Sequence, residues 1–186
     1  MGPSRILLKL SGELLSGRGG FGIDAARTLA LAQRIQKALS GSSARLALVI
    51  GGGNVLRGAR FAGGGIDRLA GDSMGMLATV MNGLALQSCF ETLGVGCSLL
   101  SAVPVGTITE AFSHRLAIDH LEKGRIVVLV GGTGHPFFTT DTTAALRALQ
   151  IGADLLAKGT KVRGIFDADP VEKPKGSTRK MPSEDD

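Results

Sequence analysis

The sequence predicts an α/β protein, a three-layer αβα sandwich with a mostly parallel open sheet. Short aliphatic runs alternate along the chain with segments of helical period, as they do in right-handed strand–helix–strand units. Most of these runs, such as the one that ends at Ile50, have no regular polar face, which is typical of strands covered by helices on both sides. The length of 186 residues suits one such domain.

Each strand is predicted from an aliphatic run, and three of these runs end in turns of small residues at Ser11, Gly51 and Gly131. Each helix is predicted from apolar residues three or four positions apart, the first helix following Asp24, which is a suitable N-cap. In chain order the predicted strands are 5–10, 45–50, 97–100, 125–130 and 153–158, and the predicted helices are 24–40, 72–93, 113–123 and 142–151.

Composition and charge exclude several other classes of protein. No apolar run approaches the ~18–20 residues needed to span a bilayer, and Arg5 and Lys9 interrupt the only segment that resembles a signal peptide. The net charge of +5 is small and no basic block occurs, so we expect neither a nucleic-acid nor a membrane partner. Cys89 and Cys97 are expected to be reduced core residues of a cytoplasmic protein.

The composition changes near the end of the chain. Residues 1–170 are expected to form the folded domain, whereas 171–186 are charged, contain prolines and lack any apolar run. We therefore expect a loop or tail over 171–186. An open α/β sheet is not complete at this point, so the C-terminal part of the fold is expected to be missing from this sequence.

Three strands that end in glycine-rich turns point to a site for phosphates. Ligands of open parallel sheets bind beyond the carboxyl ends of the strands, where glycines let backbone N–H groups approach an anion. Glycines also make tight turns for steric reasons alone, but three such turns on one edge favour a polyphosphate or two-nucleotide site. The absence of any Gly-Lys pair excludes a P-loop. A G-x-G-x-x-G match at 17–22 follows no strand directly and indicates a flexible loop.

Charged residues accompany these turns. Lys9 lies on an otherwise apolar strand and requires either an anionic partner or an exposed edge. Asp72 fits either a helix N-cap or a ligand contact, and Asp141 fits a cap of the helix that follows it. Together with Arg57 and Lys158, Lys9 and Asp141 make a set of charges that suits phosphoryl transfer.

The motifs in this order resemble those of the bacterial uridylate (UMP) kinase family, a branch of the amino acid kinase superfamily. The matching stretches are Lys-Leu-Ser-Gly-Glu at 9–13, Gly-Gly-Gly-Asn at 51–54 with Arg-Gly at 57–58, Gly-Asp to Met-Leu-Ala-Thr at 71–79, and Thr-Gly-His-Pro-Phe-Phe-Thr-Thr-Asp at 133–141. The resemblance extends from about Arg5 to Pro170. His135 stands where the family commonly has Asn, and Arg163 where an acidic residue is usual.

The resemblance implies a role for each stretch. Lys9, Arg57 and Asp141 are implied to be catalytic, with Lys9 stabilising charge on the transferred phosphoryl group and Asp141 orienting that lysine. The implied ATP-binding residues are Lys9, Leu10, Ser11, Gly12, Gly53, Arg57, Thr160, Phe166 and Asp169. The implied UMP-binding residues are Gly52, Asp72, Thr133, Gly134, His135, Pro136, Phe137, Phe138, Thr139 and Thr140. Gly17, Arg18, Gly19, Gly20, Phe21 and Gly22 match a segment linked to GTP activation in some members. No residue is implied as a metal ligand.

The implied reaction is transfer of the γ-phosphoryl group of ATP to UMP, giving UDP and ADP with Mg²⁺, in pyrimidine nucleotide synthesis. The resemblance also implies a cytoplasmic homohexamer with GTP as an activator and UTP as an inhibitor. Two alternatives stay open. The first alternative is another amino acid kinase, acting on a carboxylate or carbamate. The second is a non-catalytic nucleotide-binding protein or fragment.

Overall fold

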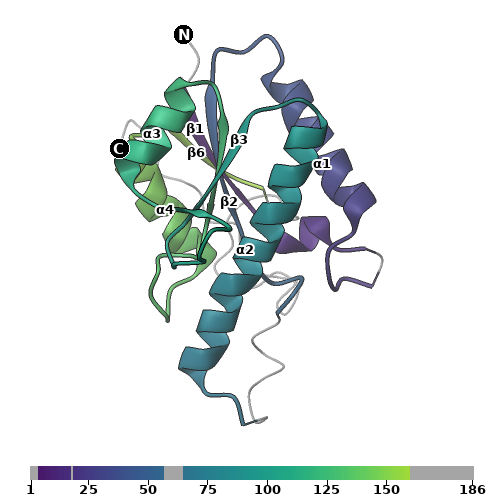
Figure 1. The fold of residues 1–186 in the computed structure, drawn as a ribbon, viewed down its shortest axis with the longest axis vertical. Coiled ribbons are helices and arrows are strands. Elements are labelled where there is room, and N and C mark those ends of the chain that lie inside the picture. The colour runs from purple at the N-terminus through teal and green to yellow at the C-terminus, as the bar shows by residue number, and fades with distance from the viewer. Residues whose placement is uncertain (1–3, 18, 57–64, 160–186) are drawn as a thin grey trace, which may run out of the picture.

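A parallel six-stranded sheet forms the centre of the molecule in the computed structural model, which describes residues 4–17, 19–56 and 65–159 (Figure 1). The strand order is β4-β3-β5-β2-β1-β6, and every pair of neighbours is parallel. The strands are β1 (Arg5–Leu10), β2 (Arg45–Ile50), β3 (Cys97–Ser101), β4 (Glu110–Ala111), β5 (Ile126–Val130) and β6 (Leu155–Lys158). The predicted fold class is confirmed.

Helices cover both faces of this sheet. Helices α1 and α2 pack on one face, and α3 and α4 pack on the other (Figure 1). Their bounds are α1 (Ala25–Leu39), α2 (Arg68–Thr92), α3 (His114–Glu122) and α4 (Thr140–Ile151). Two short elements escaped the sequence patterns, the strand β4 and the 3-10 helix η1 (Gly12–Leu15), because a few residues carry no recognisable period.

The helix caps confirm one sequence expectation and correct two. Asp24 caps α1, its side chain accepting a hydrogen bond from the backbone of Arg27 as expected. Asp72 is not an N-cap, because α2 begins four residues earlier than predicted and Asp67 caps it. Asp141 is not a cap either, since Thr139 precedes α4 and accepts the hydrogen bond from Thr142. Both acids therefore lie inside helices, with their carboxylates available for other contacts.

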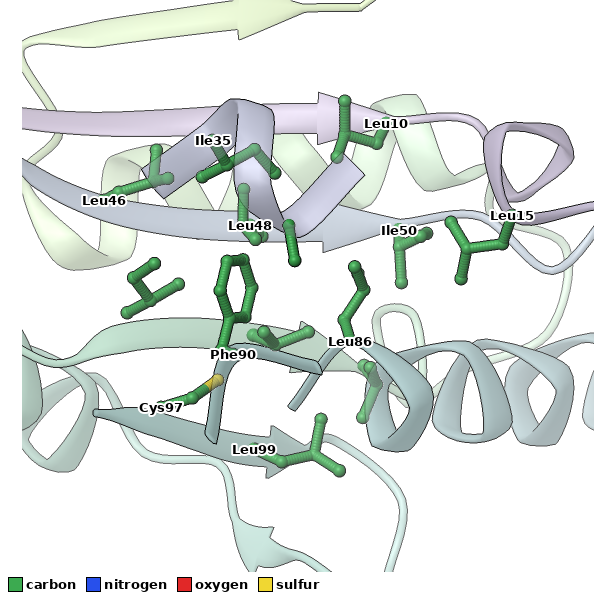
Figure 2. Close-up of a cluster of buried hydrophobic side chains, with 14 of the residues drawn as sticks. Leu10, Leu15, Ile35, Leu46, Leu48, Ile50, Leu86, Phe90, Cys97 and Leu99 are labelled. Atoms are coloured by element: carbon green, nitrogen blue, oxygen red, sulfur yellow. The ribbon is translucent and has the colours of Figure 1, made fainter. Parts of the chain in front are cut away.

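The larger of two core clusters lies between the sheet and the α1–α2 layer. Figure 2 shows Phe90 of α2 at its centre, between Leu48 on β2 and Cys97 on β3. Phe90 is fully buried, and burial raises the pKa of the Cys97 thiol to about 12, so the thiol stays protonated at neutral pH.

In the part of the chain that the structure describes, no helix is long and apolar enough to cross a lipid bilayer.

Because the strands are parallel, their carboxyl ends meet at one edge. Lys9 on β1 is in register with Val49 on β2 and with Lys158 on β6. Side chains of a strand alternate between faces. Leu7 packs in the smaller core cluster, on the side of α3 and α4, so Lys9 points to that side as well. The register thereby brings two lysines to the edge where α4 begins.

Phe90→Ala is expected to lower the free energy of unfolding by about 3–5 kcal/mol, because it removes a fully buried ring and leaves a cavity. Phe21→Ala is the control, since this ring is 67% exposed and should change stability by less than about 0.5 kcal/mol. Urea unfolding of the two variants measures the difference. Equal losses of stability in both would contradict the assignment of Phe90 to the core.

Candidate active site

Two lysines and one aspartate form an ionic cluster at the carboxyl edge of the sheet. The Lys9 ammonium lies 2.8 Å from Asp141 Oδ1, and the Lys158 ammonium donates to Asp141 Oδ2 at 2.7 Å. Lys9 is largely buried, with 13% of its side chain exposed, so the carboxylate provides the anionic partner that its apolar strand demands. Each carboxylate oxygen holds one lysine, which fixes both ammonium groups side by side.

The charge state of Asp141 follows from the same contacts. Partial burial works against its ionisation, but the hydrogen bonds and charges of Lys158 and Lys9 outweigh burial and hold the pKa of Asp141 below its usual value. Asp141 is therefore ionised at neutral pH, and the cluster sets two lysines against one carboxylate, which gives it an excess of positive charge.

Close backbone packing explains two of the glycines beside this cluster. A Cβ atom at Gly12 would overlap the Asn54 side chain and the carbonyl oxygen of Gly51. A Cβ atom at Gly52 would lie 2.8 Å from the Cβ of Ala78 on α2. These turns must therefore be made of glycine for the strand ends to approach each other and α2.

A buried asparagine pair supports the turn after β2. Asn54 and Asn82 donate to each other's side-chain oxygens at 2.9 and 2.7 Å, and Asn82 also donates to the Gly51 carbonyl at 2.7 Å. Asn54 further donates to the carbonyl of Gly22 at 2.9 Å, while the Gly22 N–H donates to the Asn54 carbonyl at 2.7 Å. The loop before α1 is thus tied to the glycine turn.

The turn after β5 has two side-chain supports. The Gly131 N–H donates to Thr79 of α2 at 2.8 Å. Arg147 of α4 is buried, donates to the Gly132 carbonyl at 3.1 Å, and holds its guanidinium 3.9 Å from the ring centroid of Phe112. These contacts fix the backbone of the third glycine turn relative to both helix layers.

A cavity of about 210 Å³ opens between the turns after β2 and β5 and the first turns of α2. Its walls combine backbone from glycines with hydroxyl, imidazole, carboxylate and apolar side chains, a mixture suited to a small polar ligand with a flat ring. The lining residues are Gly52, Gly53, Leu56, Gly71, Asp72, Gly75, Met76, Thr79, Gly132, His135, Phe138, Thr140 and Thr143.

Asp72 lines this cavity and joins α2 to the turn after β5. Its Oδ2 atom accepts the backbone N–H of Phe137 at 2.8 Å, and the Arg68 guanidinium donates to both of its oxygens at 3.1–3.2 Å. The Phe137 N–H is the main cause that holds the pKa of Asp72 below its usual value, with Arg68 adding to it. Asp72 is therefore ionised at neutral pH.

The structure brings many of the residues singled out from the sequence into two adjoining places. Lys9 and Asp141 share the ionic cluster, Ser11 and Gly12 follow β1 beside it, and the Leu10 side chain lies in the core. From the implied UMP-binding set, Gly52, Asp72, His135, Phe138 and Thr140 line the cavity, and so does Gly53 from the implied ATP-binding set.

The rest of these residues lie elsewhere. Thr133, Gly134, Pro136, Phe137 and Thr139 belong to the turn that borders the cavity without being among its lining residues. Within the implied GTP segment, Gly17, Gly19, Gly20, Phe21 and Gly22 form the loop before α1. Arg18, Arg57, Thr160, Phe166 and Asp169 are outside the described residues, as is the tail expected over 171–186.

Sequence reasoning missed several supports of the site, above all Asn82, Thr79 and Arg147. An asparagine in the middle of a long apolar helix is a usable signal, because a buried amide must find partners. Arg147 gave no comparable signal, since a lone arginine on a helix is ordinary surface composition. Within the described ranges 4–17, 19–56 and 65–159, no group of three or more potential metal-ligating side chains occurs.

Fold and site together define an α/β protein of parallel strands whose glycine turns converge on a charged edge. Residues 4–182 match the model of the Amino acid kinase family, and the chain belongs to that family. The chain is 55% identical over 166 residues to the uridylate kinase of Xanthomonas axonopodis pv. citri (strain 306), a match covering 89% of this chain and 69% of that relative. It is 54% identical over 170 residues to the uridylate kinase of Methylococcus capsulatus (strain Bath), covering 91% and 71%.

Solved structures give the same picture of the fold. The UMP kinase from Bacillus anthracis superposes with a TM-score of 0.86 at 30% identity, over 96% of this chain and 73% of that one. The UMP kinase from Ureaplasma parvum gives 0.84 at 34% identity, over 95% and 75%. An isopentenyl phosphate kinase, 19% identical with a TM-score of 0.64, shares the fold.

Lys158→Met is expected to raise the pKa of Asp141 toward its ordinary value, because one of the two hydrogen bonds to the carboxylate is lost. In the wild type, this low pKa contributes stability above about pH 4, the unfolded value, and the contribution is lost as the pH falls through the folded pKa. A ¹³C NMR titration of the Asp141 carboxyl measures the shift.

Lys123→Met is the matched control for this titration, since Lys123 pairs with Asp119 on α3 and does not contact Asp141. An unchanged Asp141 pKa in the Lys158→Met variant would show that Lys158 does not hold the carboxylate.

Proposed function

We propose that this chain transfers the γ-phosphoryl group of ATP to UMP, producing UDP and ADP. The observation that carries the proposal is the Lys9–Asp141–Lys158 cluster beside the cavity lined by Asp72 and His135. The identity of 54–55% to curated uridylate kinases supports UMP as the acceptor. Phosphoryl transfer needs positive charge around the migrating group and tight positioning of both substrates, and this edge supplies both kinds of group.

The acceptor nucleotide is proposed to occupy the cavity. Its mixed polar and apolar lining suits a nucleotide, and the similarity to curated uridylate kinases favours a pyrimidine nucleotide. Asp72 is ionised and offers acceptor oxygens for ribose hydroxyls. Phe138 and Thr140 also line the cavity, where an aromatic face and a hydroxyl can contact the base and the phosphate.

The donor phosphates are proposed to lie over the Lys9–Lys158 pair. Negative charge that develops on the transferred group is stabilised by the Lys9 ammonium, while Asp141 keeps both ammonium groups in place. Backbone N–H groups of the turns at Gly12 and Gly53 can approach phosphate oxygens closely. Arg57, Thr160, Phe166 and Asp169 are proposed as further ATP contacts on the family resemblance alone.

Mg²⁺ is proposed to arrive as part of the Mg–ATP substrate. Asp141 is the carboxylate nearest to the lysines, and both of its oxygens are already bonded to them. The described residues therefore do not fit a resident Mg²⁺ site, and the reaction is derived without one.

Regulation and assembly complete the proposal. GTP is proposed as an activator that binds at the loop over 17–22. The two hydrogen bonds between Gly22 and Asn54 connect this loop directly to the glycine turn after β2. UTP is proposed as an inhibitor, and pyrimidine nucleotide synthesis in the cytoplasm as the setting.

A homohexamer is proposed because α2 projects beyond the sheet (Figure 1) and carries exposed apolar side chains, namely Leu69, Met74, Leu77 and Met81.

ADP production from Mg–ATP, measured with UMP, CMP, AMP and N-acetylglutamate offered separately, tests the proposal. We expect turnover with UMP, and Lys9→Met should lower kcat by about a hundredfold to a thousandfold, because a preorganised charge at the transferred group is lost. Lys123→Met removes an exposed lysine remote from the cluster and should leave kcat unchanged. Absence of turnover with every acceptor would overturn the proposal, and UMP binding would then identify a non-catalytic nucleotide-binding protein.

The proposed assembly has its own test. Met81→Asp places a charge on the exposed apolar face of α2 and should reduce the molecular mass in solution, as measured by light scattering. Leu149→Asp is the matched control on α4, where the side chain is 83% exposed, and should leave the mass unchanged. A wild-type protein that runs as a monomer would contradict the assembly.

A further inference from the structure

A three-residue clasp, made of Arg68, Asp72 and Phe137, lies beside the cavity, which Asp72 lines. Arg68 and Asp72 are one turn apart at the start of α2, whereas Phe137 belongs to the turn between β5 and α4. The Arg68 guanidinium lies 5.4 Å from the ring centroid of Phe137 and donates to both oxygens of Asp72. The Phe137 N–H completes the clasp by donating to Asp72 Oδ2 at 2.8 Å.

We propose that Arg68 is a positioning residue for the acceptor nucleotide, acting through Asp72 and Phe137. In this assignment Arg68 latches the β5–α4 turn onto α2 and aims the Asp72 carboxylate into the cavity. The positioning role rests on the proposed function, whereas the clasp is present in the chain without any ligand.

The backbone conformation of Phe137 shows why the clasp is needed. Its φ of 71° lies in the left-handed region, and Phe137 is the one non-glycine residue with a positive φ in the described ranges 4–17, 19–56 and 65–159. A bulky side chain adopts this conformation only when surrounding contacts compensate for its cost. The ring is 60% exposed, so the core does not hold it. The Asp72 carboxylate accepts the Phe137 N–H, and the Arg68 guanidinium lies over the Phe137 ring, so these two contacts support this backbone conformation.

Asp72 retains capacity for a ligand while it holds the turn. A carboxylate offers about four acceptor positions on its two oxygens. Oδ2 accepts from Phe137 and from Arg68, whereas Oδ1 accepts from Arg68 alone. A hydroxyl of a bound nucleotide can therefore add to Oδ1 without breaking the clasp. Arg68 fixes the plane of the carboxylate, and thereby the direction in which this free position points.

The first test needs no nucleotide. Hydrogen–deuterium exchange of the amides over 133–139 is compared between the wild type, Arg68→Gln and the control Lys123→Gln. Lys123 makes the same kind of exposed pair one helical turn apart, with Asp119 at 2.6 Å, but lies far from the cavity. We expect Arg68→Gln to accelerate exchange over 133–139 by about three- to tenfold. This factor corresponds to the combined free energies of an exposed ion pair and a cation–π contact. The control should match the wild type.

The second test separates positioning from general structure. Arg68→Gln is expected to raise KM for UMP by about three- to tenfold and to leave KM for ATP within about twofold of the wild-type value. Arg68→Lys keeps the charge but loses the Nε–H donor and the guanidinium over the Phe137 ring, so it should recover only part of the loss. Melting temperatures within a few degrees of the wild type for all variants, as expected of exposed positions, exclude unfolding as the cause.

Each outcome decides something different. Unchanged exchange in Arg68→Gln would overturn the clasp. Faster exchange with an unchanged KM for UMP would leave the clasp in place and overturn the positioning role. Equal increases of both KM values would mark a general structural effect and overturn it as well. If the wild type turned over no acceptor, the proposed function would fail, and with it the positioning role, while the exchange result would still decide the clasp.

Discussion

The buried end of Lys9 sets the constraint on which the site depends. A lysine at the end of a central strand cannot remain without an anion, because its charge is mostly removed from water. The anion comes from the first turn of α4, and α4 can deliver it only because β5 lies two strands away in the same parallel sheet. The sheet order, the direction of the β5–α4 turn and the start of α4 are thus tied to one ion pair.

The glycine turns satisfy a second constraint, which is one of space. The strand ends, α2 and the loop before α1 all meet within hydrogen-bond distance of Gly51 and Asn54. Side chains at Gly12 or Gly52 would separate these parts. The buried amides of Asn54 and Asn82 then replace the hydrogen bonds that water would otherwise supply to the enclosed backbone. The strand ends thus approach α2 closely while their polar groups stay hydrogen-bonded. The backbone N–H groups of the glycine turns then lie at the edge of the sheet that carries Lys9 and Asp141.

The layers and the strand order along the chain could be predicted from sequence because aliphatic runs and helical periods are strong local signals. The start of α2 could not, since residues 68–71 show no clear apolar period and Asp67 lies next to a segment rich in glycine. The need of Lys9 for an anionic partner was predictable from its burial in an apolar strand. The pairing of Arg68 with Phe137 was not, because it joins residues nearly seventy positions apart through a backbone conformation that the sequence does not encode locally.

The two acids of the edge differ in a way that suits two different ligands. Asp141 is bonded through both oxygens to lysines, so two ammonium groups face one carboxylate and the cluster keeps an uncompensated positive charge. A polyanion that arrives there completes the pairing of the second lysine. Asp72 is paired one-to-one with the Arg68 guanidinium, so this pair has no excess charge to attract a phosphate, but the carboxylate keeps an acceptor position for a hydroxyl. Under the proposed function, the excess positive charge at Lys9 and Lys158 attracts the phosphate groups, and the open acceptor position of Asp72 takes a hydroxyl of the nucleotide. These two interactions together orient an acceptor in the cavity before any contact specific to its base is made.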